Sequence, residues 1–457
     1  MPMSTSPPSL LGGDGSDGEV GEEAVSIDSR RTGDTSLSLP RPADVVWPEH
    51  FVEAVAAQVA VDAASSAGPL AAAPAVVAVF QVCSTWRAAS LSELLWQDLT
   101  RRVWTNRDRS PPSWRDEFVR LHRTAANFRA RRYAYSHLLP SSPVALSCRR
   151  LALSDDHLAA GFLNGSVCLF DLPAGQLLAT YWANPHLDRL GRFSRAISGI
   201  VLAEPDERLV FASQDGDVHV VRLSIAGSVQ RAHVGNLMED GTLVDFTGNS
   251  RWWVGLFAGV PGRSWRVWDA ATEQLVYVGG TLTDPDAVLG WHMLIDLSSP
   301  VVGRVRIVEP GFAVGFTDSS MEVVDLNDVG AMVIRLELPH GAVVDSVDAC
   351  EDRVIVVDSR GLAMVHWVPA LQEICRFSTL RRAEDQHELG EMSACMNRNY
   401  AVVRSADRVR VWDATTGEYL YRFRERIGEA LVVAASDRYV AAWATDTGLH
   451  LWDFGDM

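Results

Sequence analysis

The strongest constraint on the fold is a pair of short strands that recurs along the chain after residue 150. Each pair joins an apolar strand, through a turn, to a second strand that ends in a large side chain and usually an acid. We predict the first strands at His157–Phe162, Arg208–Ser213, Trp252–Ala258, 312–317, Arg353–Asp358, Tyr400–Ser405 and Tyr439–Ala444. The second strands end at Phe170-Asp171, Val221-Arg222, Trp268-Asp269, Val324-Asp325, His366-Trp367, Trp412-Asp413 and Trp452-Asp453. These ends recur about every 40–56 residues, which is the spacing of four-stranded β-propeller blades.

The turns between the paired strands support this interpretation. Asn164-Gly165 and Asp215-Gly216 tolerate the positive φ that a tight hairpin requires. The last pair is followed by only a few residues, so the last blade needs an outer strand from elsewhere, and we expect residues 133–139 to supply it. The sequence therefore predicts a mainly β fold with a seven-bladed WD-type β-propeller over residues 141–457.

The residues before the propeller have a different pattern. Residues 1–43 are rich in Ser, Gly, Pro and acids, which predicts a disordered tail. Residues 44–105 predict an all-α module, because apolar side chains recur there at spacings of three and four and Gly68-Pro69 marks a helix break. Residues 106–140 predict a linker helix whose apolar side includes Phe118 and Phe128.

Composition excludes several classes of function. The formal net charge of −17 repels nucleic acid and anionic membranes, so we expect no direct nucleic-acid or membrane partner. No apolar run reaches the roughly 20 residues of a membrane-spanning helix. The six cysteines are scattered, which argues against a disulfide framework or a zinc site. Residues 101–132 are rich in arginine, which fits either a solvated basic surface or a docking site for an acidic protein.

The chain contains no lysine, so all 41 basic residues are arginine. Base-composition bias in the coding sequence is one explanation. The other is protection from ubiquitin, since a subunit beside a ubiquitin-transfer site would otherwise be modified on its own lysines. The second explanation predicts little self-modification on side chains in a reconstituted ligase, and abundant conjugation at internal sites would contradict it.

The predicted helical module resembles an F-box. The resemblance rests on WPE at 47–49, on VFQVCSTWR at 79–87 and on LWQDL at 95–99. The segment 59–74 differs, because it is longer and richer in alanine than the corresponding segment of the family pattern. It implies a Skp-type linker protein as partner and, through it, a cullin scaffold. The linker-binding residues that it implies are Trp47, Pro48, Phe51, Val55, Val79, Val82, Cys83, Trp86, Leu95 and Trp96. The alternative is that these helices merely cap the propeller.

From residue 44 onward the whole chain resembles the plant STERILE APETALA proteins. The longest matching motifs are GRFSRA at 191–196, LVDFTGNSRWWVGLFAGVPG at 243–262 and GGTLTDP at 279–285. The resemblance implies a nuclear adaptor, with the cytoplasm as a second location, that marks transcriptional repressors for degradation and so controls flower and organ growth. Members of this family have also been described as transcriptional regulators.

No catalytic, cofactor or metal motif is present, so we predict a non-enzymatic subunit without a cofactor. The twelve histidines are isolated, and a propeller hydrolase is unsupported. Two irregular insertions are candidates for target binding, because arginine and tryptophan are frequent interface anchors. The candidate residues are Arg189, Arg192, Arg195, Asp284, Trp291 and His292. The alternative is that Trp291 packs inside a blade and that the arginines pair with neighbouring acids.

Two functions of different classes remain open. An adaptor would bind ligase subunits through the helical module and target proteins through the propeller. A non-catalytic transcriptional regulator or scaffold would use the propeller without ubiquitination. Co-purification with a cullin complex distinguishes the two functions.

Overall fold

A computed structural model describes residues 47–105, 111–138, 147–183, 195–203, 207–223, 228–280, 303–317, 320–328, 331–339, 342–380, 392–405, 407–428 and 430–455. The larger unit of the chain, residues 49–457, is compact. The predicted disordered tail at 1–43 lies outside the described residues. No helix in the described ranges is long and apolar enough to cross a membrane.

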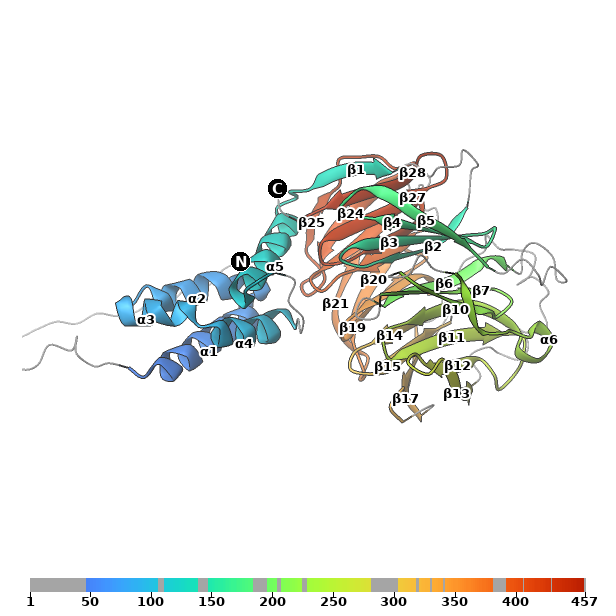
Figure 1. The fold of residues 1–457 in the computed structure, drawn as a ribbon, viewed down its shortest axis with the longest axis horizontal. Helices are drawn as coiled ribbons and strands as arrows, with labels where there is room; N and C mark the ends of the chain where they lie inside the picture. Colours follow the sequence, from blue (N-terminus) through green and yellow to red (C-terminus); the bar gives the residue numbers. More distant parts are fainter. Residues whose placement is uncertain are drawn as a thin grey trace, which may run out of the picture. The chain divides into compact units, whose positions relative to one another are not determined.

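The N-terminal part of the larger unit is helical, as predicted (Figure 1). The α-helices are α1 Glu49–Ala67, α2 Ala72–Phe80, α3 Ser84–Ala88, α4 Glu93–Trp104 and α5 Trp114–Arg129, with the 3₁₀ turns η2 Pro69–Ala71 and η3 Ala89–Leu91. Gly68 ends α1 because it has φ of 86°, which suits glycine. Ser92 and Ser113 begin α4 and α5 as N-caps, since their side chains accept the Leu95 and Asp116 backbone N–H groups. We call α1–α4 with the two 3₁₀ turns the helical module.

The core of the helical module is apolar and well filled. Small residues of α1, such as Ala56 and Ala60, let the neighbouring helices approach closely. The Trp96 ring lies 6.0 Å from the Phe80 ring and 5.3 Å from the Phe118 ring, measured between centroids. Phe118 belongs to α5, so the core includes the first half of that helix.

The second half of α5 belongs to a different core. The Phe128 ring is fully buried and stacks on Tyr400 and Phe454 at centroid distances of 4.6 and 4.0 Å. Both partners belong to the β-sheet region, so one helix contributes to two hydrophobic cores. The predicted linker helix is therefore a packed element at Trp114–Arg129.

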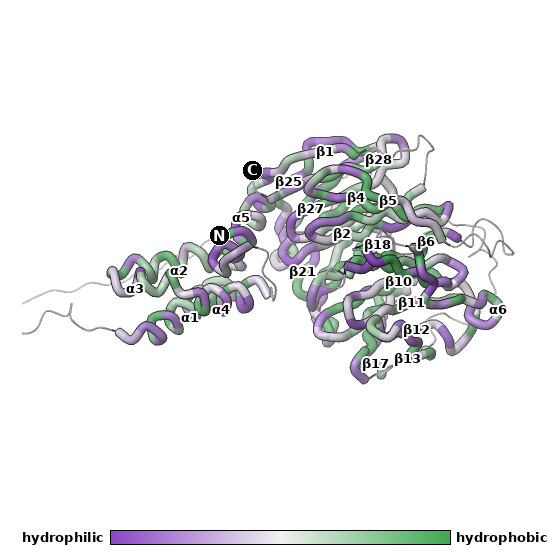
Figure 2. The backbone as a smooth tube through the Cα atoms, in the orientation of Figure 1, coloured by the Kyte–Doolittle hydropathy of each residue, from purple (hydrophilic) through white to green (hydrophobic). Residues whose placement is uncertain are grey.

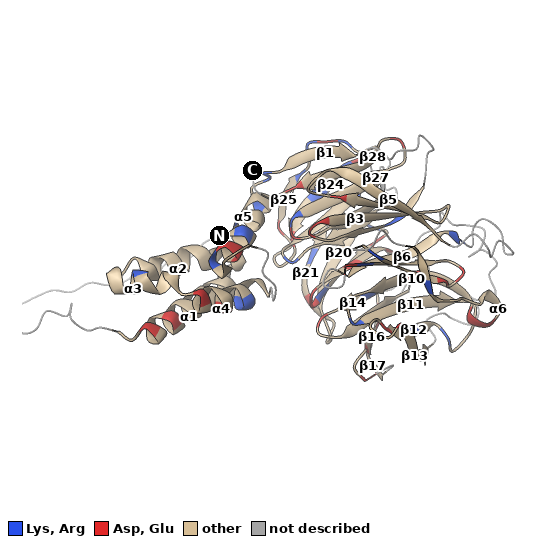
Figure 3. Ribbon diagram, in the orientation of Figure 1, with Lys and Arg blue, Asp and Glu red and all other residues tan. Residues whose placement is uncertain are grey.

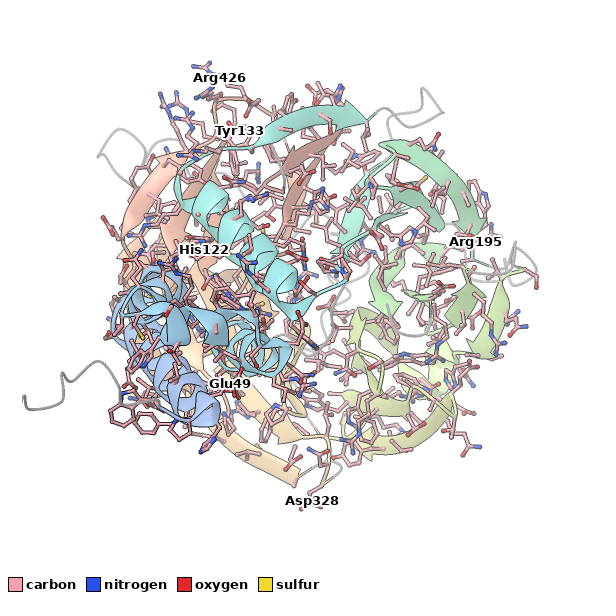
Figure 4. All side chains as sticks on the ribbon, turned by 60° about the vertical axis from the view of Figure 1, so that its left-hand side comes forward. Glu49, His122, Tyr133, Arg195, Asp328 and Arg426 are labelled. Atoms are coloured by element: carbon pink, nitrogen blue, oxygen red, sulfur yellow. The ribbon has the colours of Figure 1, made fainter. Side chains whose placement is uncertain are left out.

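The rest of the unit consists of antiparallel sheets that stand around a common centre (Figure 4). Five separate four-stranded sheets are hydrogen-bonded in the orders β2-β3-β4-β5, β14-β15-β16-β17, β18-β19-β20-β21, β22-β23-β24-β25 and β1-β28-β27-β26. The strands of the first two are β2 Cys148–Leu153, β3 His157–Phe162, β4 Ser166–Asp171, β5 Gln176–Trp182, β14 Arg304–Val308, β15 Phe312–Phe316, β16 Ser320–Asp325 and β17 Ala331–Glu337. The next two contain β18 Val344–Cys350, β19 Arg353–Asp358, β20 Leu362–Trp367, β21 Gln372–Ser378, β22 Ser393–Met396, β23 Tyr400–Ser405, β24 Arg408–Asp413 and β25 Tyr419–Arg422. The fifth contains β1 Ala134–Leu138, β26 Ala430–Ala435, β27 Tyr439–Ala444 and β28 Gly448–Asp453.

The remaining strands form one continuous eight-stranded sheet, together with the short helix α6 Leu237–Asp240. Its strands are β6 Ile197–Ala203, β7 Arg208–Ser213, β8 Val218–Arg222, β9 Gln230–His233, β10 Thr242–Gly248, β11 Trp252–Ala258, β12 Trp265–Asp269 and β13 Gln274–Gly279. Two antiparallel halves meet where Gly199 pairs in parallel with Phe246. A Cβ on Gly199 would lie 1.9 Å from the Phe246 carbonyl oxygen, so glycine permits this contact. Hydrogen bonding thus gives five separate blades and one double-width sheet, and the predicted count of seven blades is not confirmed.

The last sheet is closed by a strand from much earlier in the chain. β1 pairs antiparallel with β28, in a register that runs from Ala134 opposite Asp453 to Leu138 opposite Leu449. The prediction that residues 133–139 supply the outer strand is therefore confirmed. This pairing covers the edge of β28, which would otherwise expose unpaired backbone groups.

The two residues of each Trp-Asp pair have separate structural roles. Trp412 and Trp452 are buried between neighbouring sheets, and Trp268 is buried between the two halves of the eight-stranded sheet. The following acids organise turns: Asp269 Oδ1 accepts the Thr272 N–H at 2.7 Å, and Asp413 Oδ1 accepts the Thr416 N–H at 2.9 Å. Each pair therefore fixes the packing of a blade and ends its strand.

Candidate protein-docking surfaces

Large apolar side chains lie on the outside of the helical module. Leu91, Leu94 and Val82 are 76%, 73% and 63% exposed, and Val77 on α2 is also exposed. All of α2 is uncharged and apolar, as Figures 2 and 3 show. Soluble monomers rarely keep groups of large apolar side chains in water, so such groups indicate interaction sites. We call Val82, Leu91 and Leu94 the apolar docking residues.

The predicted linker-binding residues divide by burial. Trp47, Pro48, Phe51, Val82 and Cys83 are exposed, and Val55 and Trp86 are half-buried. The others, Val79, Leu95 and Trp96, are buried in the core. The Trp96 indole N–H donates to the Ser90 carbonyl at 2.7 Å, which fixes its ring inside the module. Val79, Leu95 and Trp96 therefore pack in the core beneath the exposed residues. Contact of the exposed residues with a linker protein stays a prediction.

Leu91 and Leu94 were not among the predicted linker-binding residues. The periodicity of α4 could have identified Leu94, because its buried positions Leu95, Leu99 and Val103 define one face of the helix. Leu94 lies next to that face and not on it. Leu91 precedes the Ser92 cap, where an apolar residue often packs back onto the helix, but here it is exposed.

The predicted target-binding residues fall mostly outside the described part of the chain. Arg189, Arg192, Asp284, Trp291 and His292 are among the residues not described. Arg195 is described and is half-buried; Figure 4 labels it. A Cβ on Gly165 would lie 2.9 Å from the Arg195 carbonyl oxygen, so Arg195 packs against the β3–β4 hairpin turn. Target binding by these residues stays a prediction.

The innermost strands carry a chain of alternating charges. Arg150 on β2 and Arg306 on β14 each lie 3.0 Å from a different oxygen of Asp245 on β10. Arg306 also lies 3.2 Å from Asp348 on β18. The four side chains line a cavity of about 300 Å³ that also contacts Glu309 and Glu351. We call Arg150, Asp245, Arg306 and Asp348 the charge chain.

Burial acts differently on the two carboxyls of the charge chain, and it raises the pKa of Asp348 despite the neighbouring Arg306. Burial opposes ionisation of Asp245, but Arg150 and Arg306 outweigh it and hold the pKa of that carboxyl below its usual value. Arg149 and Arg304 also lie near the charge chain. Neither forms an ion pair with a carboxylate of the described residues. Burial, reinforced by Arg150, lowers the pKa of Arg149 to about 10 and that of Arg304 to about 9. In the described residues, no three His, Cys, Asp or Glu side chains are grouped so that they could hold a metal ion.

Comparison with known proteins now places the chain in a family. No family model matches it. Over 466 residues it is 46% identical to the transcriptional regulator STERILE APETALA of Arabidopsis thaliana, and the match covers 100% of both chains. The chain belongs to the STERILE APETALA family. Among solved structures, the β-propeller domain of Cps50 (Swd1) from Myceliophteria thermophila matches 70% of this chain and 99% of its own, with a TM-score of 0.51. At 13% identity that match shows the fold alone, a β-propeller.

In this STERILE APETALA family protein, the helical module is tied to the propeller by polar contacts as well as by Phe128. Arg398, in the turn before β23, donates to the Trp104 carbonyl at the end of α4 and lies 2.7 Å from Glu351. Glu351 also accepts from the Thr105 hydroxyl. The Tyr421 hydroxyl donates to the Phe128 carbonyl at 2.6 Å. These contacts hold the C-terminal end of α4 and the second half of α5.

Proposed function

We propose that this STERILE APETALA family protein is a substrate adaptor of an SCF-type ubiquitin ligase, in which the helical module is an F-box. The supporting observation is the exposure of Val82, Leu91 and Leu94 in the helical module, whose core is filled by other apolar side chains. Most of each side chain is not covered by the described residues, so burial against a partner is the gain that explains their exposure. The partner is a Skp-type linker protein, which connects the adaptor to a cullin scaffold.

The position of Leu94 near the N-terminal end of α4 suits this role. Trp104, at the C-terminal end of α4, is the residue whose carbonyl binds Arg398 of the propeller. Leu94 lies ten residues earlier on the same helix, or about 15 Å away at the α-helical rise. A linker protein bound at Leu94 therefore approaches the end of α4 that does not contact the propeller.

The propeller is the target-binding half in this proposal. Its innermost strands follow one another in the order β2, β6, β10, β14, β18, β22 and β26, and β26 neighbours β2 again. This adjacency supports counting the eight-stranded sheet as two blades, which gives seven. Propellers bind other proteins through loops held by a rigid frame. The family membership supports transcriptional repressors as targets, the nucleus as the site of action, and flower and organ growth as the process controlled.

The alternative function is a transcriptional regulator or scaffold without ubiquitination. The name of the Arabidopsis relative, a transcriptional regulator, favours it. In that case the propeller would assemble regulators, and the apolar docking residues would contact a subunit unrelated to ligases.

Binding of a purified Skp-type linker protein to the whole chain separates the two functions. We expect saturable binding that is lost in the double variant Leu91→Glu with Leu94→Glu, because each change places a charge in an apolar interface. The control is Leu178→Glu on β5, where a leucine is 48% exposed on the propeller. Equal binding by the double variant and the control would contradict the proposed surface, and no binding by the unchanged chain would favour the scaffold.

A further inference from the structure

A group of arginines lies where the chain passes from α5 to β1, beside the segment that follows β25. Arg129 is the last residue of α5, and Arg132 lies two residues before β1. Arg422 is the last residue of β25, and Arg424 and Arg426 follow it. All five are exposed, and the side chains of Arg129 and Arg426 are 50% and 74% exposed. We call these five residues the arginine corner.

Direct contacts hold the two segments of the arginine corner together. The Tyr133 hydroxyl accepts the Arg424 backbone N–H at 3.2 Å and donates to Glu425 Oε2 at 3.0 Å. The Tyr133 ring also lies 5.3 Å from the Phe423 ring, measured between centroids. Figure 4 labels Tyr133 and Arg426 at the same edge of the propeller. The arginines of both segments therefore belong to one surface, which is held by packed aromatic rings.

Burial alternates along the segment that follows β25. Phe423 and Ile427 are 4% and 0% exposed and pack in the core, whereas Arg422, Arg424 and Arg426 are exposed. Successive side chains of an extended segment point to opposite sides. The three arginines are therefore presented together to solvent, while their neighbours fix the segment to the propeller.

The surroundings of the arginine corner do not neutralise it. Arg131 and Arg408 bring the number of arginines to seven. Five described carboxylates lie around them, on Asp407, Asp413, Glu418, Glu425 and Asp446. The neighbouring Arg438 and Asp453 pair with each other and cancel. The described residues thus leave an excess of two positive charges, in a chain whose net charge is −17.

These carboxylates are also engaged with other groups. Glu425 Oε2, which accepts from Tyr133, accepts the Trp452 indole N–H at 2.9 Å as well. Asp407 is shared by two arginines, with its oxygens 3.5 Å from Arg408 and 3.5 Å from Arg426. One shared carboxylate does not satisfy two guanidinium groups, each of which has five N–H donors.

Three members of the arginine corner have no anion of their own. Among the described residues, Arg132, Arg422 and Arg424 form no ion pair with a carboxylate. Arg129 lies 3.9 Å from Asp413, a distance at which an exposed pair contributes little. Neighbouring like charges repel, so this grouping does not stabilise the isolated chain. An acidic partner would turn the repulsion into attraction.

We propose that the arginine corner binds an acidic segment of a partner protein, whose Asp and Glu side chains pair with the exposed guanidinium groups. A guanidinium presents a planar fork of N–H donors that matches a carboxylate. The charge of the whole chain favours a short acidic segment over nucleic acid. A nucleic acid extends well beyond the roughly 8 Å over which exposed charges act at physiological salt, and it would meet the negative remainder of the chain.

Fluorescence anisotropy of a labelled, alternating Glu-Ala decapeptide with the whole chain tests the proposal. Alternate side chains of an extended peptide face one side, as the arginines of this segment do. We expect saturable binding that weakens with salt, and no binding of the matching Gln-Ala decapeptide. Affinity should fall about tenfold or more in the triple variant Arg422→Gln, Arg424→Gln and Arg426→Gln, and less in the double variant Arg129→Gln with Arg132→Gln.

The control is the triple variant Arg87→Gln, Arg115→Gln and Arg222→Gln. These arginines are exposed elsewhere on the chain, so the control makes the same change in net charge without altering the arginine corner. Each variant is used only if its circular dichroism and melting temperature match those of the unchanged chain. The two test variants alter different segments, so one remains if the other fails to fold.

Three results would overturn the proposal. One is the absence of saturable peptide binding up to roughly 1 mM at low ionic strength. Another is an equal loss of affinity in the control, because net charge and not the arginine corner would then explain binding. The third is tighter binding of an oligothymidylate of the same length that is lost in the test variants, which would identify the surface as a nucleic-acid site.

This experiment is independent of the proposed ligase function. The arginine corner contains none of the apolar docking residues, so both test variants should bind a Skp-type linker protein as the unchanged chain does. Failure of the acidic peptide to bind would leave the linker contact standing, and failure of the linker protein to bind would leave the arginine corner standing.

Discussion

Leu91 and Leu94 of the helical module lie in solvent, whereas Asp245 and Asp348 of the propeller lie inside it. The helical module has completed its core and still leaves apolar side chains outside. The propeller has completed its core and still retains charges in its centre. Neither arrangement lowers the free energy of the isolated chain, because apolar groups favour burial and charges favour water. The helical module thus keeps apolar groups at its surface, and the propeller keeps paired charges in its centre.

The largest effect is expected from breaking the charge chain. Asp245→Ala leaves Arg150 and Arg306 buried without their shared carboxylate, and removal of one partner from a buried ion pair costs about 3–5 kcal/mol. Urea unfolding followed by tryptophan fluorescence measures the change. Glu337→Ala, at an exposed carboxylate on β17, is the control and should cost less than about 1 kcal/mol. A loss below 1 kcal/mol in Asp245→Ala would show that the charges in the centre are solvated.

A smaller effect is expected where α5 joins the propeller. Tyr421→Phe removes the hydrogen bond to the Phe128 carbonyl, which still accepts the Arg131 N–H at 3.2 Å, so the expected cost is about 0.5–1.5 kcal/mol. Hydrogen exchange of the α5 amides should become faster. Tyr277→Phe is the control, because the Tyr277 hydroxyl makes no hydrogen bond to the described residues. Unchanged exchange in Tyr421→Phe would mean that Phe128 stacking alone holds the helix.

The smallest effect on stability is expected at the apolar docking residues. Leu91→Glu and Leu94→Glu should each change the free energy of unfolding by less than about 0.5 kcal/mol, because both side chains are exposed. Thermal unfolding by circular dichroism measures this. A melting temperature that falls by several degrees in either variant would show that the leucine stabilises the module itself, which would remove the reason to expect a partner there.

The strands could be predicted from the sequence because their information is local. The predicted strands His157–Phe162 and Trp252–Ala258 coincide with β3 and β11, since each is a short apolar run bounded by turn residues. The joining of β6 to β10 could not be predicted, because it depends on Gly199 meeting Phe246, a partner from the other half of the sheet. The same limit applies to α5. Phe118 and Phe128 lie on one apolar stripe, and nothing in that stripe indicates that it serves two cores.

The candidate sites were predicted less completely than the fold. The F-box resemblance identified Val82 but also Val79 and Trp96, which are buried, because a motif does not separate the core from the surface. It missed Leu91 and Leu94. The charge chain could not be identified, since Arg150, Asp245, Arg306 and Asp348 are far apart in the sequence and meet only when the sheets assemble.

Hydrogen–deuterium exchange of the whole chain, with and without a purified Skp-type linker protein, tests the central claim most directly. The docking account predicts that the linker protein slows exchange between Val82 and Leu94, and leaves the propeller strands β2–β28 unchanged. Exchange that is unaltered between these residues at saturating linker protein, or that slows only in the propeller, would contradict it.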